Sequence, residues 1–367
     1  MPHSANPFTP AFGTNPYILA GRDAILDDMR EAFINGPGDP NLSTLIIGAR
    51  GTGKTALMSR IRTIAIEEGW LAVGTTALPG MLDDLYEQSV QASEHLIASK
   101  SSRKLSSVSV GPVSAGWEHE SKTAGNWRTR MGKLLDQLEE HGTGLLMTVD
   151  EVQEGLDELV LLAATYQHFV TEGRKVALVM AGLPYHVDRL ISNKSVSFLR
   201  RSAQRRIGHI GSSDVEEALT QTIVDAGKDI TPEATELCVQ AIAGFAYMLQ
   251  LVGYRTWNAG RDDAILGLDS ATRGILLARR DMEDHVLSAT YRELSAKDIA
   301  FLEAMLPDKQ YSRMSTIAER MGVTTGYAAK YKSRLLALGI ICEQGKGLVA
   351  FDMPGLRSYV EARCTNG

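Results

Sequence analysis

The sequence is poor in cysteine and has no apolar run long enough to cross a membrane. Its 367 residues include only three cysteines, Cys238, Cys342 and Cys364, and their wide spacing matches no metal-binding pattern. We therefore expect reduced thiols rather than disulfides or a zinc site. The opening residues, MPHSANPFTPAFGTNPY, contain no basic segment followed by an apolar one, so we expect no signal peptide and a cytoplasmic protein.

The chain also lacks an overall excess of basic residues. It has 38 Lys and Arg against 44 Asp and Glu, a net charge of -6, which provides no general attraction to nucleic acid. Its length is sufficient for two or three domains with cores of their own. Any affinity for nucleic acid must therefore reside in one part of the chain.

Short apolar runs alternate with helical patterns in the first half of the chain. The runs TLIIGA, WLAVGTT, GLLMTVDE and KVALVMAG indicate buried strands of a parallel sheet covered by helices on both faces. This predicts the α/β class, with a three-layer αβα core over residues 17–205 after an irregular arm over 1–16. A serine-rich stretch at about 101–120 alternates around Gly111 and Pro112, which predicts a β-hairpin inserted in that core.

Helical patterns dominate after about Arg205, and residues 206–290 are interpreted as a helical lid. The segment TPEATELCVQAIAGFAYMLQLVGYRTW is expected to be one helix. It opens with Thr231 as the N-cap and Pro232 at the first helical position.

The segment from Gly48 to Thr55 matches the pattern G-x-x-x-x-G-K-[ST] and stands between a buried strand and a helix. Its glycines allow main-chain amides to surround phosphate oxygens, and the helix N-terminus adds free donors and partial positive charge. Lys54 is expected to reach the β- and γ-phosphates of ATP, and the Thr55 hydroxyl to bind Mg²⁺. The predicted nucleotide-binding residues of this loop are Gly48, Gly51, Thr52, Gly53, Lys54, Thr55 and Ala56.

The strand LLMTVDE ends in two acids, Asp150 and Glu151. Asp150 is expected to hold Mg²⁺, directly or through water, and Glu151 to act as the general base that polarises the attacking water. Strands often end in surface acids, so this signal is weak alone. It is stronger here because it follows a phosphate loop with a strand and a helix between them.

Residues 291–367 have the pattern of a winged helix. Ser295 caps a first helix, Gly322 opens the turn between a second and a third, and IICEQGKGLVAF predicts a hairpin that forms the wing. This part carries 11 basic and 8 acidic residues, a balance of +3 against -9 for the rest of the chain. The local basic charge favours binding to double-stranded DNA, although winged helices also dock proteins or serve as scaffolds. The predicted DNA contacts are Thr325, Tyr327, Lys330, Arg334 and Lys346.

Together these motifs resemble AAA+ ATPases of the replication-initiator, or origin-recognition, type and their bacterial relatives. The STAND signalling ATPases share much of the pattern. ILAGRDAILDDM resembles the box that precedes the phosphate loop in this family, which implies that Leu19, Gly21 and Arg22 lie near the adenine. AGFAYMLQLVG, residues 243–253, resembles the family's lid segment. Arg255 in the same helix is a candidate contact for the γ-phosphate, and a surface salt bridge is the alternative.

The sequence departs from this family after the fourth strand. VALVMAGLP supplies Ala181, Gly182 and Pro184 where the family places a polar sensor of the γ-phosphate, which implies slow hydrolysis or a nucleotide-bound switch. Further on, the resemblance implies an arginine that reaches a neighbouring subunit's γ-phosphate, with Arg200 and Arg201 as candidates. A solvated basic helix end or a DNA-facing patch would explain these two residues equally well.

The sequence therefore predicts an ATP-binding and ATP-hydrolysing AAA+ protein that couples nucleotide state to DNA binding. The alternative is a STAND-like regulatory switch whose winged helix contacts a protein partner. Assembly into a homo-oligomer is compatible with both. A metabolic kinase with the same loop is disfavoured, because small kinases have no place for the lid and the C-terminal module.

Overall fold

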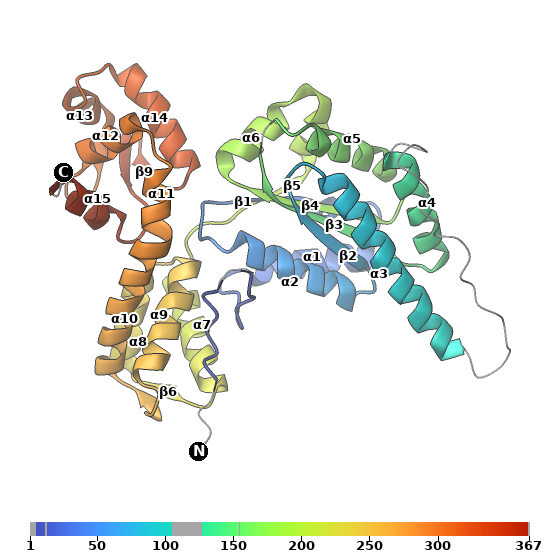
Figure 1. Cartoon of the computed structure of the whole chain (residues 1–367), viewed down its shortest axis with the longest axis horizontal. Coiled ribbons are helices and arrows are strands. Elements are labelled where there is room, and N and C mark those ends of the chain that lie inside the picture. The colour runs from blue at the N-terminus through green and yellow to red at the C-terminus, as the bar shows by residue number, and fades with distance from the viewer. Residues whose placement is uncertain (1–4, 12, 105–126, 154, 366–367) are drawn as a thin grey trace.

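Five parallel strands form a sheet at the centre of the N-terminal half (Figure 1). The computed structural model describes residues 5–11, 13–104, 127–153 and 155–365. The strand order is β2-β3-β4-β1-β5, with every neighbouring pair parallel. The strands are β1 (Ser43–Ile47), β2 (Leu71–Thr76), β3 (Leu145–Val152), β4 (Val176–Gly182) and β5 (Ala203–Arg206). This order places the carboxyl ends of β1, β3 and β4 next to one another.

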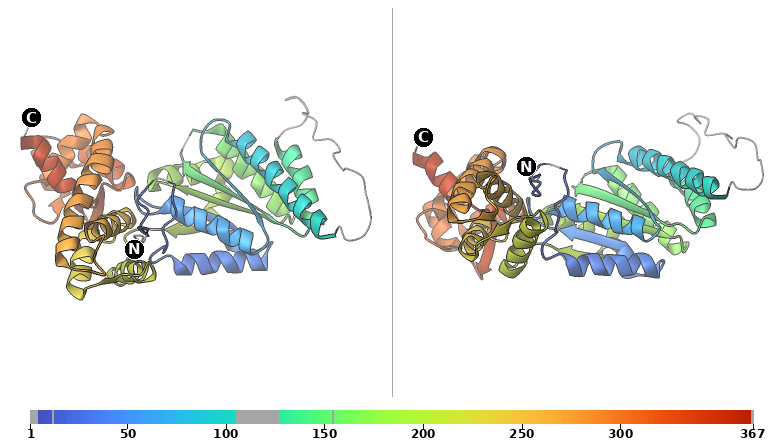
Figure 2. Two further views of the ribbon diagram at one scale, coloured as in Figure 1. Left: turned by 60° about the horizontal axis from the view of Figure 1, so that its bottom comes forward. Right: turned by 90° about the horizontal axis from the view of Figure 1, so that it is seen from below.

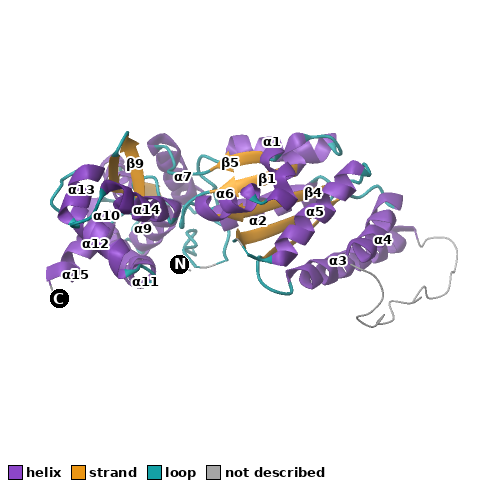
Figure 3. Ribbon diagram, turned by 90° about the horizontal axis from the view of Figure 1, so that it is seen from above, coloured by secondary structure: helices purple, strands orange, loops and turns teal. Residues whose placement is uncertain are grey.

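Helices cover both faces of the sheet, which confirms the predicted αβα core (Figure 3). One face carries α1 (Asp23–Asn35) and α2 (Lys54–Glu67), with η1 (Pro40–Leu42) between α1 and β1. The other face carries α3 (Met81–Lys104), α4 (Trp127–Glu140), α5 (Asp157–Thr171), α6 (Pro184–Ser192) and the short helix η2 (Lys194–Arg201). Along β1, Ile46 packs toward the first layer while Leu45 and Ile47 pack toward the second, as the period-two geometry of a strand requires.

The predicted hairpin at about 101–120 falls largely outside the described residues. Residues 101–104 are described and continue helix α3.

The edge strand β5 was not expected from the sequence. It pairs with β1 along Thr44 to Ile47, and its residues alternate between half-buried and exposed. Arg205 points inward and donates to Asp28 Oδ2 at 2.6 Å. An edge strand with polar residues has no apolar run, so the sequence suggested only a basic patch. The expected boundary between core and lid, after residue 205, therefore lies within a strand.

The lid contains four helices and a two-stranded parallel pair. They are α7 (Ser212–Asp225), β6 (Asp229–Ile230), α8 (Pro232–Ile242), α9 (Ala246–Ala259), β7 (Ile265–Leu266) and α10 (Leu268–Met282). Thr231 caps α8 by accepting from the Ala234 amide at 3.3 Å, as predicted.

The single helix expected over the second part of the lid is wrong. Ala243 and Gly244 have φ angles of 50° and 75°, which end α8 before α9 begins. A side chain at Gly244 would place its Cβ 2.7 Å from the Ile210 carbonyl oxygen, and the Ile210 amide donates to the Gly244 carbonyl at 2.8 Å. This junction fixes the start of α9 against the segment that leaves the sheet.

The C-terminal module follows α10 through the short π-helix η3 (Glu283–Leu287) and the helix α11 (Ser288–Arg292). It comprises α12 (Ala296–Met305), β8 (Ser312–Arg313), α13 (Met314–Arg320), α14 (Thr325–Ala337), β9 (Ile341–Gly345), β10 (Leu348–Phe351) and α15 (Leu356–Thr365). Its sheet is antiparallel in the order β8-β10-β9. Ser295 and Asp298 form a capping box at the start of α12, which confirms the predicted cap. Helices α12, α13 and α14 and the hairpin of β9 and β10 lie where the sequence predicts them, whereas β8 and α15 were not predicted.

The lid and the C-terminal module lie together at one end of the molecule, beside the sheet (Figure 2). One continuous hydrophobic cluster joins them, with Trp257 of α9, Met282 of α10 and Phe301 of α12 among its buried members. None of the described helices is long and apolar enough to span a membrane.

Candidate nucleotide-binding site

The loop between β1 and α2 has the geometry that its glycines predict. Gly51 and Gly53 have φ angles of +76° and +88°, a region that favours glycine. At Gly48 an added Cβ would lie 2.7 Å from the Ile207 carbonyl oxygen, so that position has no room for a side chain. The Thr52 hydroxyl donates to the Ala49 carbonyl at 2.8 Å and closes the turn. The loop therefore forms a cradle that ends in the amides of the first turn of α2.

The ammonium group of Lys54 lies inside this cradle. It donates to the carbonyl oxygens of Gly48 at 2.9 Å and Ala49 at 2.8 Å. Burial lowers the pKa of Lys54 to about 8, and the nearby carboxylates of Asp150 and Glu151 partly oppose that shift. The positive charge is thus placed where an approaching phosphate would meet it.

Asp150 and Glu151 stand at an irregularity of β3. The register with β4 shifts between Val149 and Val152, and Glu151 has a φ angle of 54°. Such bulges redirect side chains and are common beside active sites. Here the Asp150 carboxylate accepts from the Thr55 hydroxyl at 2.6 Å and from the Glu151 amide at 2.8 Å. The two predicted metal-binding residues are therefore in direct contact, and Glu151 remains exposed in the same pocket.

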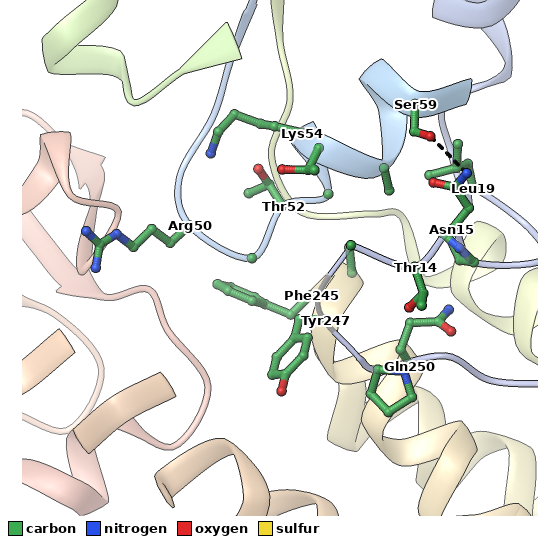
Figure 4. Close-up of a pocket in the computed structure, with 18 of the residues that line it drawn as sticks. Thr14, Asn15, Leu19, Arg50, Thr52, Lys54, Ser59, Phe245, Tyr247 and Gln250 are labelled. Atoms are coloured by element: carbon green, nitrogen blue, oxygen red, sulfur yellow. Dashed lines mark hydrogen bonds between the residues drawn. The ribbon is translucent and has the colours of Figure 1, made fainter. Parts of the chain in front are cut away.

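A pocket of about 780 Å³ extends from this loop to the lid (Figure 4). It is lined by the N-terminal arm and the residues after it, the phosphate loop with α2, the segments at the ends of β3 and β4 with the start of α6, the lid, and Met353 of the C-terminal module. The arm residues in the lining include Thr9, Pro10, Thr14 and Asn15, none of which was predicted to contact nucleotide, whereas Leu19, just after the arm, was expected near the adenine. The arm's composition indicated only an irregular segment, with no signal for a site.

The arm is held in place by both the lid and α2. Phe8 is buried and packs on Gly253 of α9 so closely that a Cβ there would overlap its ring. The Thr9 amide donates to Gln250 Oε1 at 3.0 Å, and Asn15 Nδ2 donates to Ser59 Oγ at 2.9 Å. The arm therefore forms a wall of the pocket that bridges the lid and the core.

Arg22 lines the pocket and is only 9% exposed. Its guanidinium donates to the Gly208 carbonyl at 2.8 Å and to the Thr52 carbonyl at 3.4 Å. Burial lowers its pKa, which the Asp214 carboxylate opposes. Gly21 is outside the lining, and its φ of +64° turns the chain beside Asp214. Arg22 thus joins the phosphate loop to the segment that enters the lid.

The lid meets the phosphate loop through the start of α9 rather than through Arg255. The Tyr247 amide donates to the Gly51 carbonyl at 3.3 Å, and Phe245 packs against Gly51. Arg255 lies farther along α9, is not among the lining residues, and pairs with both Asp281 carboxylate oxygens at 2.6 and 2.7 Å. The structure therefore does not bring Arg255 to the pocket, whereas it brings Tyr247 there.

Arg200 and Arg201 do not line the pocket either. Both are exposed at the end of η2, and Arg200 Nε donates to the Ile191 carbonyl at 2.9 Å. These two residues could contact only the nucleotide bound by a neighbouring subunit. Their role therefore stays a prediction.

The predicted DNA-binding residues gather on the C-terminal module. Thr325, Tyr327 and Lys330 are exposed on α14, and Lys346 is exposed in the turn between β9 and β10. Arg334 is also exposed on α14 but pairs with the buried Asp298 at 3.3 Å. Arg334 is therefore exposed like the other four but already engaged in an ion pair.

The C-terminal module also contacts the phosphate loop. Gly339, after α14, packs on Ala49, and Arg50 pairs with Glu293 at 2.8 Å. The predicted nucleotide site and the module are thus in direct contact.

The sheet order, the loop between β1 and α2 and the helical lid define a three-layer αβα fold with a phosphate loop and a helical lid. Among solved structures, the Walker-type ATPase of Pyrococcus abyssi is similar at TM-score 0.66 and 15% identity, covering 95% of this chain and 97% of that chain. The ORC2 protein of Aeropyrum pernix, in its ADPNP-ADP complexes, is similar at TM-score 0.63 and 14% identity, covering 97% of this chain and 98% of that chain. These likenesses show a shared fold over nearly the whole chain.

Sequence comparisons add one finding. A family described as "Domain of unknown function (DUF8462)" matches residues 284–360, which include most of the C-terminal module. A search of curated proteins gives no match.

Proposed function

We propose that this protein binds and hydrolyses ATP in the pocket above the phosphate loop and couples nucleotide state to DNA binding. The observation that carries the proposal is the meeting of Lys54, the Thr55–Asp150 pair and Glu151 at the carboxyl edge of the sheet. Ligands of open α/β sheets bind at this edge. The fold shared with Walker-type ATPases supports the same proposal.

The donor atoms at the site fit Mg²⁺. The Thr55 hydroxyl and an Asp150 carboxylate oxygen lie 2.6 Å apart, and both are hard oxygen ligands. Mg²⁺ typically uses one or two such groups together with waters and substrate phosphates, so a larger protein cage is not required. When bound, the ion would neutralise charge on the β- and γ-phosphates.

The protein's own groups would bind the phosphates, offset their charge and accept the proton of the attacking water. Loop amides between Gly51 and Thr55 bind phosphate oxygens, and the Lys54 ammonium offsets their charge. Glu151, exposed in the pocket next to Asp150, accepts a proton from the attacking water. The arm and Leu19 enclose the nucleoside end of the ligand.

We propose that the C-terminal module is a winged helix whose helix α14 enters the major groove of double-stranded DNA. Its three helices and antiparallel hairpin are compatible with that architecture. Thr325, Tyr327 and Lys330 would face the groove, and Lys346 a phosphate. The contact between Ala49 and Gly339 supports coupling, because a phosphate loop that rearranges around ATP must also shift its neighbour.

The test measures affinity for duplex DNA with ATP, with ADP and without nucleotide, over a series of salt concentrations. Lys54→Ala should abolish nucleotide binding, and Glu151→Gln should keep ATP bound while hydrolysing it more slowly. Lys346→Ala, at the proposed phosphate contact, should weaken binding to all DNA sequences alike and reduce the slope of its salt dependence by about one. Absence of DNA binding in every nucleotide state would remove the DNA part of the proposal.

A second candidate is a STAND-like regulatory ATPase whose module contacts a protein. The direct contact of the module with the phosphate loop favours this candidate too. The contact would keep the module docked on the core until the bound nucleotide is exchanged or hydrolysed. The discriminating result is a nucleotide-dependent release of the module, seen by limited proteolysis, in a protein that binds no duplex DNA.

A further inference from the structure

The end of β4 offers no polar side chain to the pocket, but the helix that follows does. Leu183 and Pro184 lead into α6, and His186 lies in the first turn of that helix. His186 lines the same pocket as Lys54 and Glu151. The sequence pattern directed attention to the strand end itself and therefore missed this residue, which arrives four residues after Gly182.

The imidazole of His186 has an unsatisfied nitrogen. Its Nδ1 atom is fully buried and has no hydrogen-bond partner. Buried polar atoms without partners are rare and unfavourable, and at functional sites they often mark a group that waits for a ligand. Because no hydrogen bond holds Nδ1, the ring can turn about its Cβ–Cγ bond and present an N–H to an anion in the pocket.

We propose that His186 donates a hydrogen bond to the γ-phosphate of bound ATP and so supplies the sensor that β4 lacks. This inference rests on the proposed ATP site. Gly182, at the end of β4, lies beside the phosphate loop, since its carbonyl accepts from the Gly48 amide at 3.3 Å. His186, four residues farther along the chain, lines the same pocket as Lys54, Asp150 and Glu151, which is where a nucleotide held by the loop would place its terminal phosphate.

Helix α6 connects the proposed hydrogen bond of His186 to the C-terminal module. Helix α6 also packs against α14, the proposed DNA-binding helix. A group on α6 that responds to the γ-phosphate would therefore act on a helix already in contact with the C-terminal module. His186 would distinguish ATP from ADP and would pass that distinction to α14.

The experiment measures dissociation constants for ADP and for a non-hydrolysable ATP analogue, both with Mg²⁺. The variants are His186→Ala, His186→Asn and His186→Phe. His168→Ala serves as the control, because His168 is exposed on α5 and lies outside this pocket. His186→Ala should weaken binding of the analogue about tenfold, the effect of losing a hydrogen bond to a charged group, and leave ADP binding unchanged. His186→Asn, which keeps a nearby N–H donor, should restore the preference, whereas His186→Phe should not.

Each result decides the matter. If His186→Ala binds ADP and the analogue in the wild-type ratio, or weakens both equally, His186 is not a γ-phosphate sensor although the ATP site stands. Failure of His186→Asn to restore the preference also overturns the inference. If the wild-type protein binds neither nucleotide, the proposed function itself fails.

Discussion

Gly339 of the C-terminal module lies so close to Ala49 of the phosphate loop that a methyl group at residue 339 would overlap the Ala49 side chain. Gly339 also has a φ angle of +67°, in the region that favours glycine. The turn after α14 is thus shaped both by its own backbone and by the loop that it touches. This contact makes the module a direct neighbour of the proposed nucleotide site.

Substitution of this glycine should therefore loosen the module. We expect Gly339→Ala to cost about 1 kcal/mol from its backbone conformation and a further 1–3 kcal/mol from the overlap with Ala49. Gly322→Ala is the matched control, because Gly322 has a φ of +64° but no neighbour within 4 Å. Hydrogen exchange of the loop amides should rise only in the first variant. Equal exchange in both would show that the contact does not constrain the loop.

Nucleotide affinity should decline in alkaline solution. The pKa of Lys54 is lowered by burial to about 8, and bound phosphates would favour its charged form and raise that pKa. Affinity should then be constant below pH 8 and fall above it, by at most about tenfold per pH unit. Lys54→Arg stays charged and should flatten the profile, even if it binds more weakly. Calorimetric titration from pH 7 to 9.5 tests this, and a flat wild-type profile would refute it.

The N-terminal arm should contribute to nucleotide binding. Gly253→Ala places a methyl group against the buried ring of Phe8, which should displace the arm and cost about 1–3 kcal/mol of stability. The dissociation constant for ATP should rise together with this loss. Gly132→Ala, in α4 with open space around it, should instead stabilise the fold by about 0.5–1 kcal/mol. Unchanged ATP affinity in a destabilised Gly253→Ala protein would exclude the arm from the site.

Docking of the C-terminal module should weaken as pH rises. His209 Nε2 lies 3.2 Å from Asp352 of the module, and the hydrogen bond to that carboxylate raises the pKa of His209 above its usual 6.5. The charged pair is complete below pH 6.5 and is lost as pH rises through the raised pKa. Protease accessibility of the module should increase over that interval at low salt. His209→Gln should remove the pH dependence, and a persistent one would point to another group.

The sequence was sufficient where a feature depends on local residue pattern. The loop from Gly48 to Thr55 and the acids at the end of β3 follow short motifs, and the caps at Thr231 and Ser295 depend on neighbouring residues. The long-range placement of these motifs follows from the order of apolar runs, because parallel strands bring their carboxyl ends to one edge.

Other features depend on contacts between distant segments and were missed. Strand β5 owes its place to pairing with β1, and its own residues are polar. The break between α8 and α9 requires a positive φ angle at Ala243. The spacing of apolar residues along the sequence does not reveal this break, because the contact of Gly244 with Ile210 holds it in place. The pocket walls from the arm, Tyr247 and His186 come from three separate segments. Their chemistry became apparent only when the fold brought them together.

The start of α9 already touches the phosphate loop, through the Tyr247 amide and the Gly51 carbonyl. A triphosphate that moves the Gly51 carbonyl would therefore act on α9 directly, through a hydrogen bond that is already formed. Because Gln250 of the same helix accepts from the Thr9 amide, we expect the arm to follow any such movement of α9. The lid and the arm would then respond to an occupied loop as one unit.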